Sequence, residues 1–170
     1  ELNVQYMHSN SLIAVITKNR TNPAYVGARF GAELVLATHK IPSVQLVPGN
    51  PDDIAEQSEL VRRAIELSPD AIVLAPAHTT KMKNVLEEVG AADIPLFCII
   101  SEPDPSSAVT FVGSNDRILA RNMATRLAEH LGQLGHIVII NGHPDAATSA
   151  PRAAGFREGL LPFPDISIRA

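Results

Sequence analysis

The feature that most constrains this chain is a unit that recurs along it: a short apolar run, a polar loop, and a marked helix start. Residues 12–16 are the first apolar run, and they suit a strand that is buried on both faces of a sheet. Asn22 follows as the predicted N-cap, and Pro23 stands at the first helical position, where its missing N–H costs nothing. The unit predicts parallel strands that alternate with helices.

The repeats of this unit predict the domain organisation. Four further strands are expected before residue 114, and two more after it, at residues 43–47, 71–74, 95–100, 108–112, 136–141 and 166–169. The fold class is therefore α/β with a doubly wound parallel sheet. Residues 1–114 form one complete lobe, and residues 115–170 form part of a second, because two strands make a small sheet for an independent domain.

Apolar residues three or four positions apart predict the buried faces of the helices. Asn50 and Pro51 are expected to begin the second helix, and Gly90 to end the third. In the first helix, glycines at 27 and 31 would allow close approach to the sheet. The four predicted stripes are Val26, Phe30 and Leu34; Ile54, Val61, Ala64 and Ile65; Met82, Val85, Leu86 and Val89; and Leu119, Met123 and Leu127.

Charge and composition exclude several classes of function. The net charge of −4 lacks the concentrated basic face that nucleic-acid binding needs. No apolar run reaches the roughly 18 residues of a membrane helix. The single cysteine, Cys98, lies in an apolar run and can form neither an internal disulfide nor a metal-ligand set, so a buried, inert thiol is expected.

Motifs of catalysis and cofactor binding are missing from the sequence. No glycine-rich dinucleotide or phosphate loop follows a strand, and there is no nucleophile elbow. His78 and His143 fall on loops, but neither has a second ligand at metal spacing. The sequence therefore predicts a binding protein that is not an enzyme, with no catalytic residue, cofactor or metal.

The order and spacing of several segments resemble the type I periplasmic binding proteins, and within them the ribose-binding-like sugar receptors of ABC importers. The segments, in chain order, are IAVITKNRTNPAY, NPDDIAEQ, SPDAIVLAP, IPLFCII, TFVGSND, IVIINGHPDAATSAPRAAGF and PDISIRA. The resemblance implies two lobes that close on a sugar or polyol, and membrane permease subunits as partners. It also implies a periplasmic monomer whose signal peptide has been removed.

The resemblance also suggests ligand residues at matching positions. In the sugar receptors an Asn-Pro pair after the first strand precedes two aromatics, of which Tyr25 is kept here. Ribose-type receptors end the fourth strand with Asp-Arg, whereas this chain has Ile100 and Ser101, which argues against a ribose-specific site. The predicted ligand residues are Lys18, Asn19, Asn22, Tyr25, Ser101, Glu102 and Arg152.

Two questions stay open from the sequence. Lys18 and Arg20 suggest a ligand with a carboxylate, and the alternative is that both basic side chains face solvent. The same fold also serves as the effector-binding domain of lactose-repressor-type transcription regulators and as a sugar-sensing input domain, so both remain alternatives to the transport function.

Overall fold

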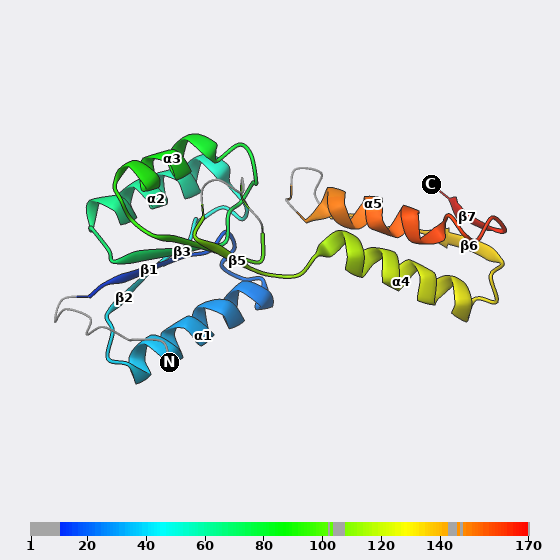
Figure 1. The fold of residues 1–170 in the computed structure, drawn as a ribbon, viewed down its shortest axis with the longest axis horizontal. Coiled ribbons are helices and arrows are strands. Elements are labelled where there is room, and N and C mark those ends of the chain that lie inside the picture. The colour runs from blue at the N-terminus through cyan, green and yellow to red at the C-terminus, as the bar shows by residue number, and fades with distance from the viewer. Residues whose placement is uncertain (1–10, 102, 104–107, 143–145, 147, 170) are drawn as a thin grey trace. The chain divides into compact units, whose positions relative to one another are not determined.

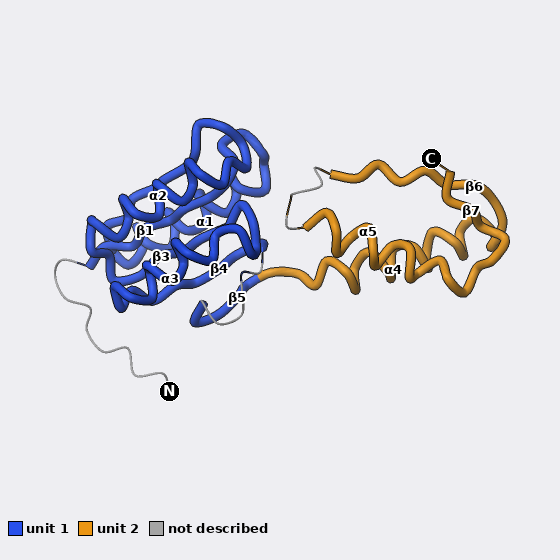
Figure 2. The backbone as a smooth tube through the Cα atoms, turned by 90° about the horizontal axis from the view of Figure 1, so that it is seen from above, with its two compact units in different colours: residues 1–112 blue, residues 113–170 orange. Residues whose placement is uncertain are grey.

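The computed structural model describes residues 11–101, 103, 108–142, 146 and 148–169. The chain divides into two compact units, residues 1–112 and 113–170 (Figure 2). Within the described ranges, no helix has the length and apolarity needed to cross a lipid bilayer.

The first unit is built on a sheet of five parallel strands in the order β2-β1-β3-β4-β5. This confirms the predicted α/β fold with a parallel sheet. Because the strands run in one direction, the loops that follow them meet at one edge of the sheet, its carboxyl edge. The strand bounds are Ile13–Ile16, Ser43–Leu46, Ala71–Leu74, Leu96–Ile99 and Thr110–Val112 for β1 to β5.

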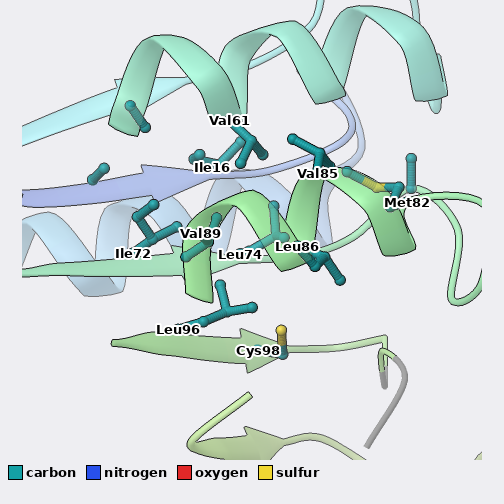
Figure 3. Close-up of a cluster of buried hydrophobic side chains, with 13 residues drawn as sticks. Ile16, Val61, Ile72, Leu74, Met82, Val85, Leu86, Val89, Leu96 and Cys98 are labelled. Carbon is teal, nitrogen blue, oxygen red and sulfur yellow. The ribbon is translucent and has the colours of Figure 1, made fainter. Parts of the chain in front are cut away.

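Helices cover both faces of this sheet, as a doubly wound fold requires (Figure 1). Helix α1, Pro23–Thr38, lies on one face, and α2, Ile54–Glu66, and α3, Lys83–Ala91, lie on the other. Side chains from β1, β3 and β4 meet those of α2 and α3 in the main hydrophobic core (Figure 3). The predicted stripes of α2 and α3 are confirmed, since all eight residues are buried or pack on this core.

The expected buried stripe of α1 is wrong. Val26, Phe30 and Leu34 are exposed, and a Cβ atom added to Gly27 or Gly31 would meet nothing within 4 Å. The neighbouring face of the helix packs against the sheet instead. On this face Tyr25 is buried, and Ala28, Ala32 and Leu36 are half-buried. The helix is apolar on more than one side, so hydrophobic spacing alone did not identify its inner face.

The predicted starts and ends of two helices also need correction. Helix α2 begins after Asp53, whose Oδ1 accepts from the N–H of Glu56 at 2.8 Å, and not at Asn50 and Pro51. Asp52 adopts a left-handed conformation with φ of 60°, which keeps this segment out of the helix. Gly90 lies inside α3, which continues to Ala91. The cap by Asn22, in contrast, is confirmed, because its Oδ1 accepts from the N–H of Ala24.

The described residues of the second unit form two parallel strands and two helices. Strand β6, Gly135–Val138, pairs with β7, Ile166–Arg169, and the helices are α4, Asp116–His130, and α5, Ser149–Leu160. The predicted stripe of α4 is wrong, since Leu119 and Met123 are exposed. Small residues on the two helices allow their backbones to approach closely instead: Ala120, Ala124 and Ala128 on α4, and Gly155 and Gly159 on α5.

Candidate functional site

The carboxyl edge of the five-stranded sheet carries an ion pair in which the lysine is buried and the carboxylate is partly exposed. Lys18 follows β1 and is only 2% exposed, and its Nζ lies 3.4 Å from Oδ1 of Asp52 in the loop after β2. The same Nζ lies 5.8 Å from the centre of the Tyr25 ring at the start of α1. A lysine is rarely this buried without a partner. The carboxylate and the aromatic ring therefore account for its place in the fold.

This geometry contradicts, for Lys18, the alternative that both basic side chains face solvent. Its neighbour Arg20 is exposed, as expected, and donates from Nη2 to the carbonyl of Val47 at 3.2 Å. Lys18 is not an uncompensated cation, because Asp52 balances its charge. The observed charges thus do not favour an anionic ligand over a neutral one.

The loop between β1 and α1 is ordered by its own amide side chains. Oδ1 of Asn19 accepts from the backbone N–H groups of Thr21 and Asn22, at 3.0 and 2.9 Å. Oδ1 of Asn22 in turn caps α1. Both asparagines use their oxygen for the backbone, and neither amide nitrogen has a hydrogen-bond partner within the described part of the chain. Two N–H₂ donors are thus available at this edge.

A buried glutamine orders the loop after β3. Gln57 of α2 is fully buried, and its Nε2 donates to the carbonyl of Ala75 at 3.0 Å. Its Oε1 accepts from the N–H of Ala77 at 2.7 Å. The side chain therefore replaces a missing sheet neighbour for two backbone groups just beyond the end of the strand.

The end of β4 combines a strained backbone with a hydroxyl that lacks a partner. Ile100 has φ of 66°, which is unusual for a β-branched residue. Ser101 is 2% exposed, and its Oγ is the one buried side-chain oxygen or nitrogen without a hydrogen bond among the residues described. Strain and unsatisfied polar groups of this kind concentrate at functional sites. Glu102, the next predicted residue, lies outside the described residues.

The remaining predicted ligand residue, Arg152, belongs to the second unit. It lies in the first turn of α5, and its Nε donates to Oδ1 of Asp116 on α4 at 2.8 Å. The arginine side chain is 60% exposed, whereas that of Asp116 is only 15% exposed. The carboxylate fixes one edge of the guanidinium, and the other N–H groups have no hydrogen-bond partner among the described residues.

A cavity of about 640 Å³ lies beside Arg152 within the second unit. Its lining is mostly apolar, with polar groups at one side, and includes Leu119, Met123, Val138, Ile140, Phe156, Asp116, Asn141 and Ser149. Such a lining suits other apolar side chains better than a solute that carries many hydroxyls. The carboxyl edge of the first unit, with its donors and aromatic ring, is the better candidate for a polar ligand.

Sequence reasoning placed four ligand candidates on one structural feature. Lys18, Asn19, Asn22 and Tyr25 lie in the β1–α1 loop or the first turn of α1, and Ser101 follows another strand of the same sheet. Asp52, Gln57 and Arg29 were missed as contributors to this edge. Their partners lie at least nine residues away and in other elements of the fold, so a local pattern does not reveal them.

Metal binding has no support in the described part of the chain, where no group of three or more potential ligand side chains comes together. Nδ1 of His78 accepts from the backbone N–H groups of Thr80 and Lys81, at 3.1 and 3.2 Å. This is an ordinary role for a polar residue in a loop. His143 lies outside the described residues.

The fold is that of a type I periplasmic binding protein. In open α/β sheets in general, ligands bind beyond the carboxyl ends of the strands. The sequence model of the family described as periplasmic binding protein domain matches residues 13–170, and the chain belongs to this family. This assignment confirms the predicted resemblance. Members of the family are binding proteins, so it also supports the prediction that the chain is not an enzyme.

Three similar proteins illustrate the relationship. A D-ribose/D-allose-binding protein of Pseudomonas aeruginosa is 27% identical over 156 residues, which cover 87% of this chain and 49% of that protein. A solute-binding protein of an ABC transporter from Actinobacillus succinogenes, solved with bound D-allose, has a TM-score of 0.85 at 24% identity and covers 94% of this chain and 58% of its own. The fructose-binding periplasmic domain of the hybrid two-component system BT1754 has a TM-score of 0.83 at 18% identity. The match covers 94% of this chain and 54% of that domain's chain. The chain spans about half the length of the curated relative.

Proposed function

We propose that this chain is part of a solute-binding protein of an ABC importer, which binds a sugar or related polyol in the periplasm. The observation that carries the proposal is the polar carboxyl edge of a sheet in a chain of the periplasmic binding protein family. The ligand is held between two lobes, with a boundary near residue 114. Closure around the ligand is driven by its higher affinity for the closed state.

The chemistry of the described residues supports a ligand rich in hydroxyl groups. Such hydroxyls need both donors and acceptors, and an aromatic face packs against the apolar side of a sugar ring. We assign the donor role to Lys18, Asn19 and Asn22, the aromatic role to Tyr25, and a hydroxyl contact to Ser101. Glu102 is retained in this set on the family resemblance alone.

Arg152 is assigned to the ligand from the second lobe. Its guanidinium is oriented by Asp116 and keeps N–H groups that no described residue accepts, so they are available as donors to a ligand hydroxyl. The membrane permease subunits of the importer then recognise the closed, ligand-bound protein, which acts as a monomer.

Thermal unfolding of the full-length protein tests the proposal. A ligand that binds only the native state raises the melting temperature with its concentration. The panel contains pentoses, hexoses, polyols and sugar acids, and we expect neutral sugars or polyols to give the shift. A panel without any shift contradicts the proposal.

A pair of variants then tests the assigned role of Arg152. Arg152→Ala should abolish the shift, whereas Arg157→Ala should preserve it, because Arg157 is exposed further along the same helix. If the ligand raised the melting temperature of both variants equally, Arg152 would not be a ligand-binding residue. Restoration of binding is not expected from Arg152→Lys, because a point charge does not reproduce the planar guanidinium.

A sensing function is the second candidate, and the similarity to the periplasmic domain of a two-component system favours it. A sensor binds its sugar with the same lobe but passes the signal to a domain of its own chain. A repressor would instead carry a DNA-binding segment before the first strand. The coding sequence on either side of residues 1–170 separates these from the transport function.

A further inference from the structure

We infer that Arg29 is the positioning residue of the β1–α1 loop, and that it holds the loop in its ligand-ready conformation without touching the ligand. The inference rests on the proposed function, because that loop carries Lys18, Asn19 and Asn22. Arg29 lies on α1, one turn after Tyr25.

The guanidinium of Arg29 makes three hydrogen bonds to three different residues of the loop. Nη1 donates to Oγ1 of Thr17 at 2.7 Å and to the carbonyl of Asn19 at 2.9 Å. Nη2 donates to the carbonyl of Arg20 at 3.0 Å. The half-buried side chain of Arg29 thus donates only to hydroxyl and carbonyl oxygens. Among the described residues, no carboxylate forms an ion pair with it.

Together with a backbone hydrogen bond from Asp52, these bonds give a donor to three consecutive carbonyls of the loop. The carbonyl of Lys18 accepts from the N–H of Asp52 at 2.8 Å, and Arg29 supplies donors to the next two. The loop has left the sheet at these positions, so no strand can satisfy them. The planar fork of arginine reaches acceptors on both of its nitrogens, which a lysine ammonium on a single stem does not reproduce.

The consequence concerns the entropy of binding. A loop that is already fixed in the free protein does not lose its conformational freedom when the ligand arrives, so its contacts contribute more fully to affinity. Loss of the hydrogen bonds from Arg29 to the loop should therefore weaken ligand binding, although no contact with the ligand is removed. It should also free the loop in the absence of any ligand.

Hydrogen exchange of the full-length protein without ligand tests the loop directly. In Arg29→Lys and Arg29→Ala, the amides of Thr21, Asn22 and Asp52 should exchange about tenfold faster, while those of β1 keep their wild-type rates and report an intact fold. The control is Arg63→Ala, which removes an exposed arginine of α2 whose side chain makes no hydrogen bond in the described part of the chain. Unchanged loop exchange in Arg29→Ala overturns the inference.

Calorimetry with the panel sugar that most raises the melting temperature tests the link to binding. The dissociation constant should rise about tenfold in both Arg29 variants and stay unchanged in the control. Millimolar guanidinium ion, compared with equal sodium chloride, should restore affinity to Arg29→Ala and leave Arg29→Lys unaffected. Faster loop exchange with unchanged affinity also overturns the inference. If no panel sugar binds the wild type, the proposed function fails, and the exchange rates alone decide whether Arg29 holds the loop.

Discussion

Lys18 and Asp52 contact each other twice, through their side chains and through their backbones. The ammonium and the carboxylate form an ion pair at 3.4 Å, and the N–H of Asp52 donates to the carbonyl of Lys18 at 2.8 Å. The loops after β1 and β2 are therefore joined at one point by two independent interactions. Only the side-chain interaction is removed by substitution, so its role can be measured separately.

The two partners should respond differently to neutralisation. Lys18→Met leaves a carboxylate that is 44% exposed and remains hydrated, so the free energy of unfolding should change by less than about 1 kcal/mol. Asp52→Asn leaves the buried ammonium without its counter-charge and should cost more, about 2 kcal/mol after allowance for the exposure of the pair. Urea unfolding measures both, and a larger loss in Lys18→Met contradicts this account. Lys18→Met should also lose sugar binding if the ammonium is a ligand contact.

Gln57 should be intolerant of an apolar substitute despite its fully buried position. Gln57→Leu leaves the carbonyl of Ala75 and the N–H of Ala77 without partners, at a cost of about 1–3 kcal/mol for each buried group. The matched control is Gln45→Leu, because Gln45 is exposed and its hydrogen bonds are long, at 3.4 Å. Urea unfolding should show a large loss for the first variant and a small change for the second. Similar values for the two would show that Gln57 serves only to fill space.

Substitution of a glycine by alanine should be more destabilising in α5 than in α1. A Cβ atom at Gly159 would overlap the carbonyl oxygen of Arg121 and lie 2.8 Å from Cβ of Ala124, so Gly159→Ala should destabilise the protein by about 1–3 kcal/mol. Gly27→Ala is the matched control. Its added Cβ meets nothing within 4 Å, and the higher helix propensity of alanine should stabilise the protein by up to about 1 kcal/mol. Opposite signs of the change in unfolding free energy are the expected result.

Glu56 should make stability depend on pH in the acid range. Its two carboxylate oxygens accept from the N–H groups of Gly49 and Asn50, at 2.6 and 3.1 Å, and these bonds hold its pKa below the ordinary value of 4.5. The folded state thus favours the charged form. The contribution is complete above the unfolded pKa and is lost as the pH falls through the lowered folded pKa.

The test for this effect is the acid limb of the stability curve. Glu56→Gln cannot lose a charge on acidification, so its melting temperature should fall less steeply than that of the wild type from about pH 5 downward. Parallel curves for the two proteins would contradict the assigned role of the carboxylate. Near neutral pH the wild type should be the more stable protein, because the carboxylate offers an acceptor oxygen to each N–H group whereas an amide offers one oxygen and a donor nitrogen, and the difference should narrow in acid.

Much of the fold could be predicted from the sequence because two kinds of local signal agreed. Apolar runs marked the strands, and α2 and α3 carry a single apolar stripe each, so their inner faces were unambiguous. Helix α1 is apolar around much of its surface, and α4 packs through alanines. Their inner faces depend on which neighbour lies close, which hydrophobic spacing does not report.

The candidate site also contains residues that local signals could place and residues whose partners depend on the tertiary fold. Asn22 and Tyr25 could be placed because a strand end and a helix cap are local features. The pairing of Lys18 with Asp52 joins residues from different loops, and Gln57 reaches a strand end 18 residues away. Such contacts follow from the order of the strands in the sheet, in which β1 lies between β2 and β3.

The buried thiol of Cys98 has a practical consequence for measuring ligand binding. It is fully buried in β4, and burial raises its pKa to about 12, so it stays protonated and unreactive in the native state. Residues 1–170 therefore present no reactive thiol to a maleimide dye. A single cysteine introduced at the exposed Thr21 would be labelled selectively in this part of the chain, and the dye would become an optical reporter beside the proposed sugar site.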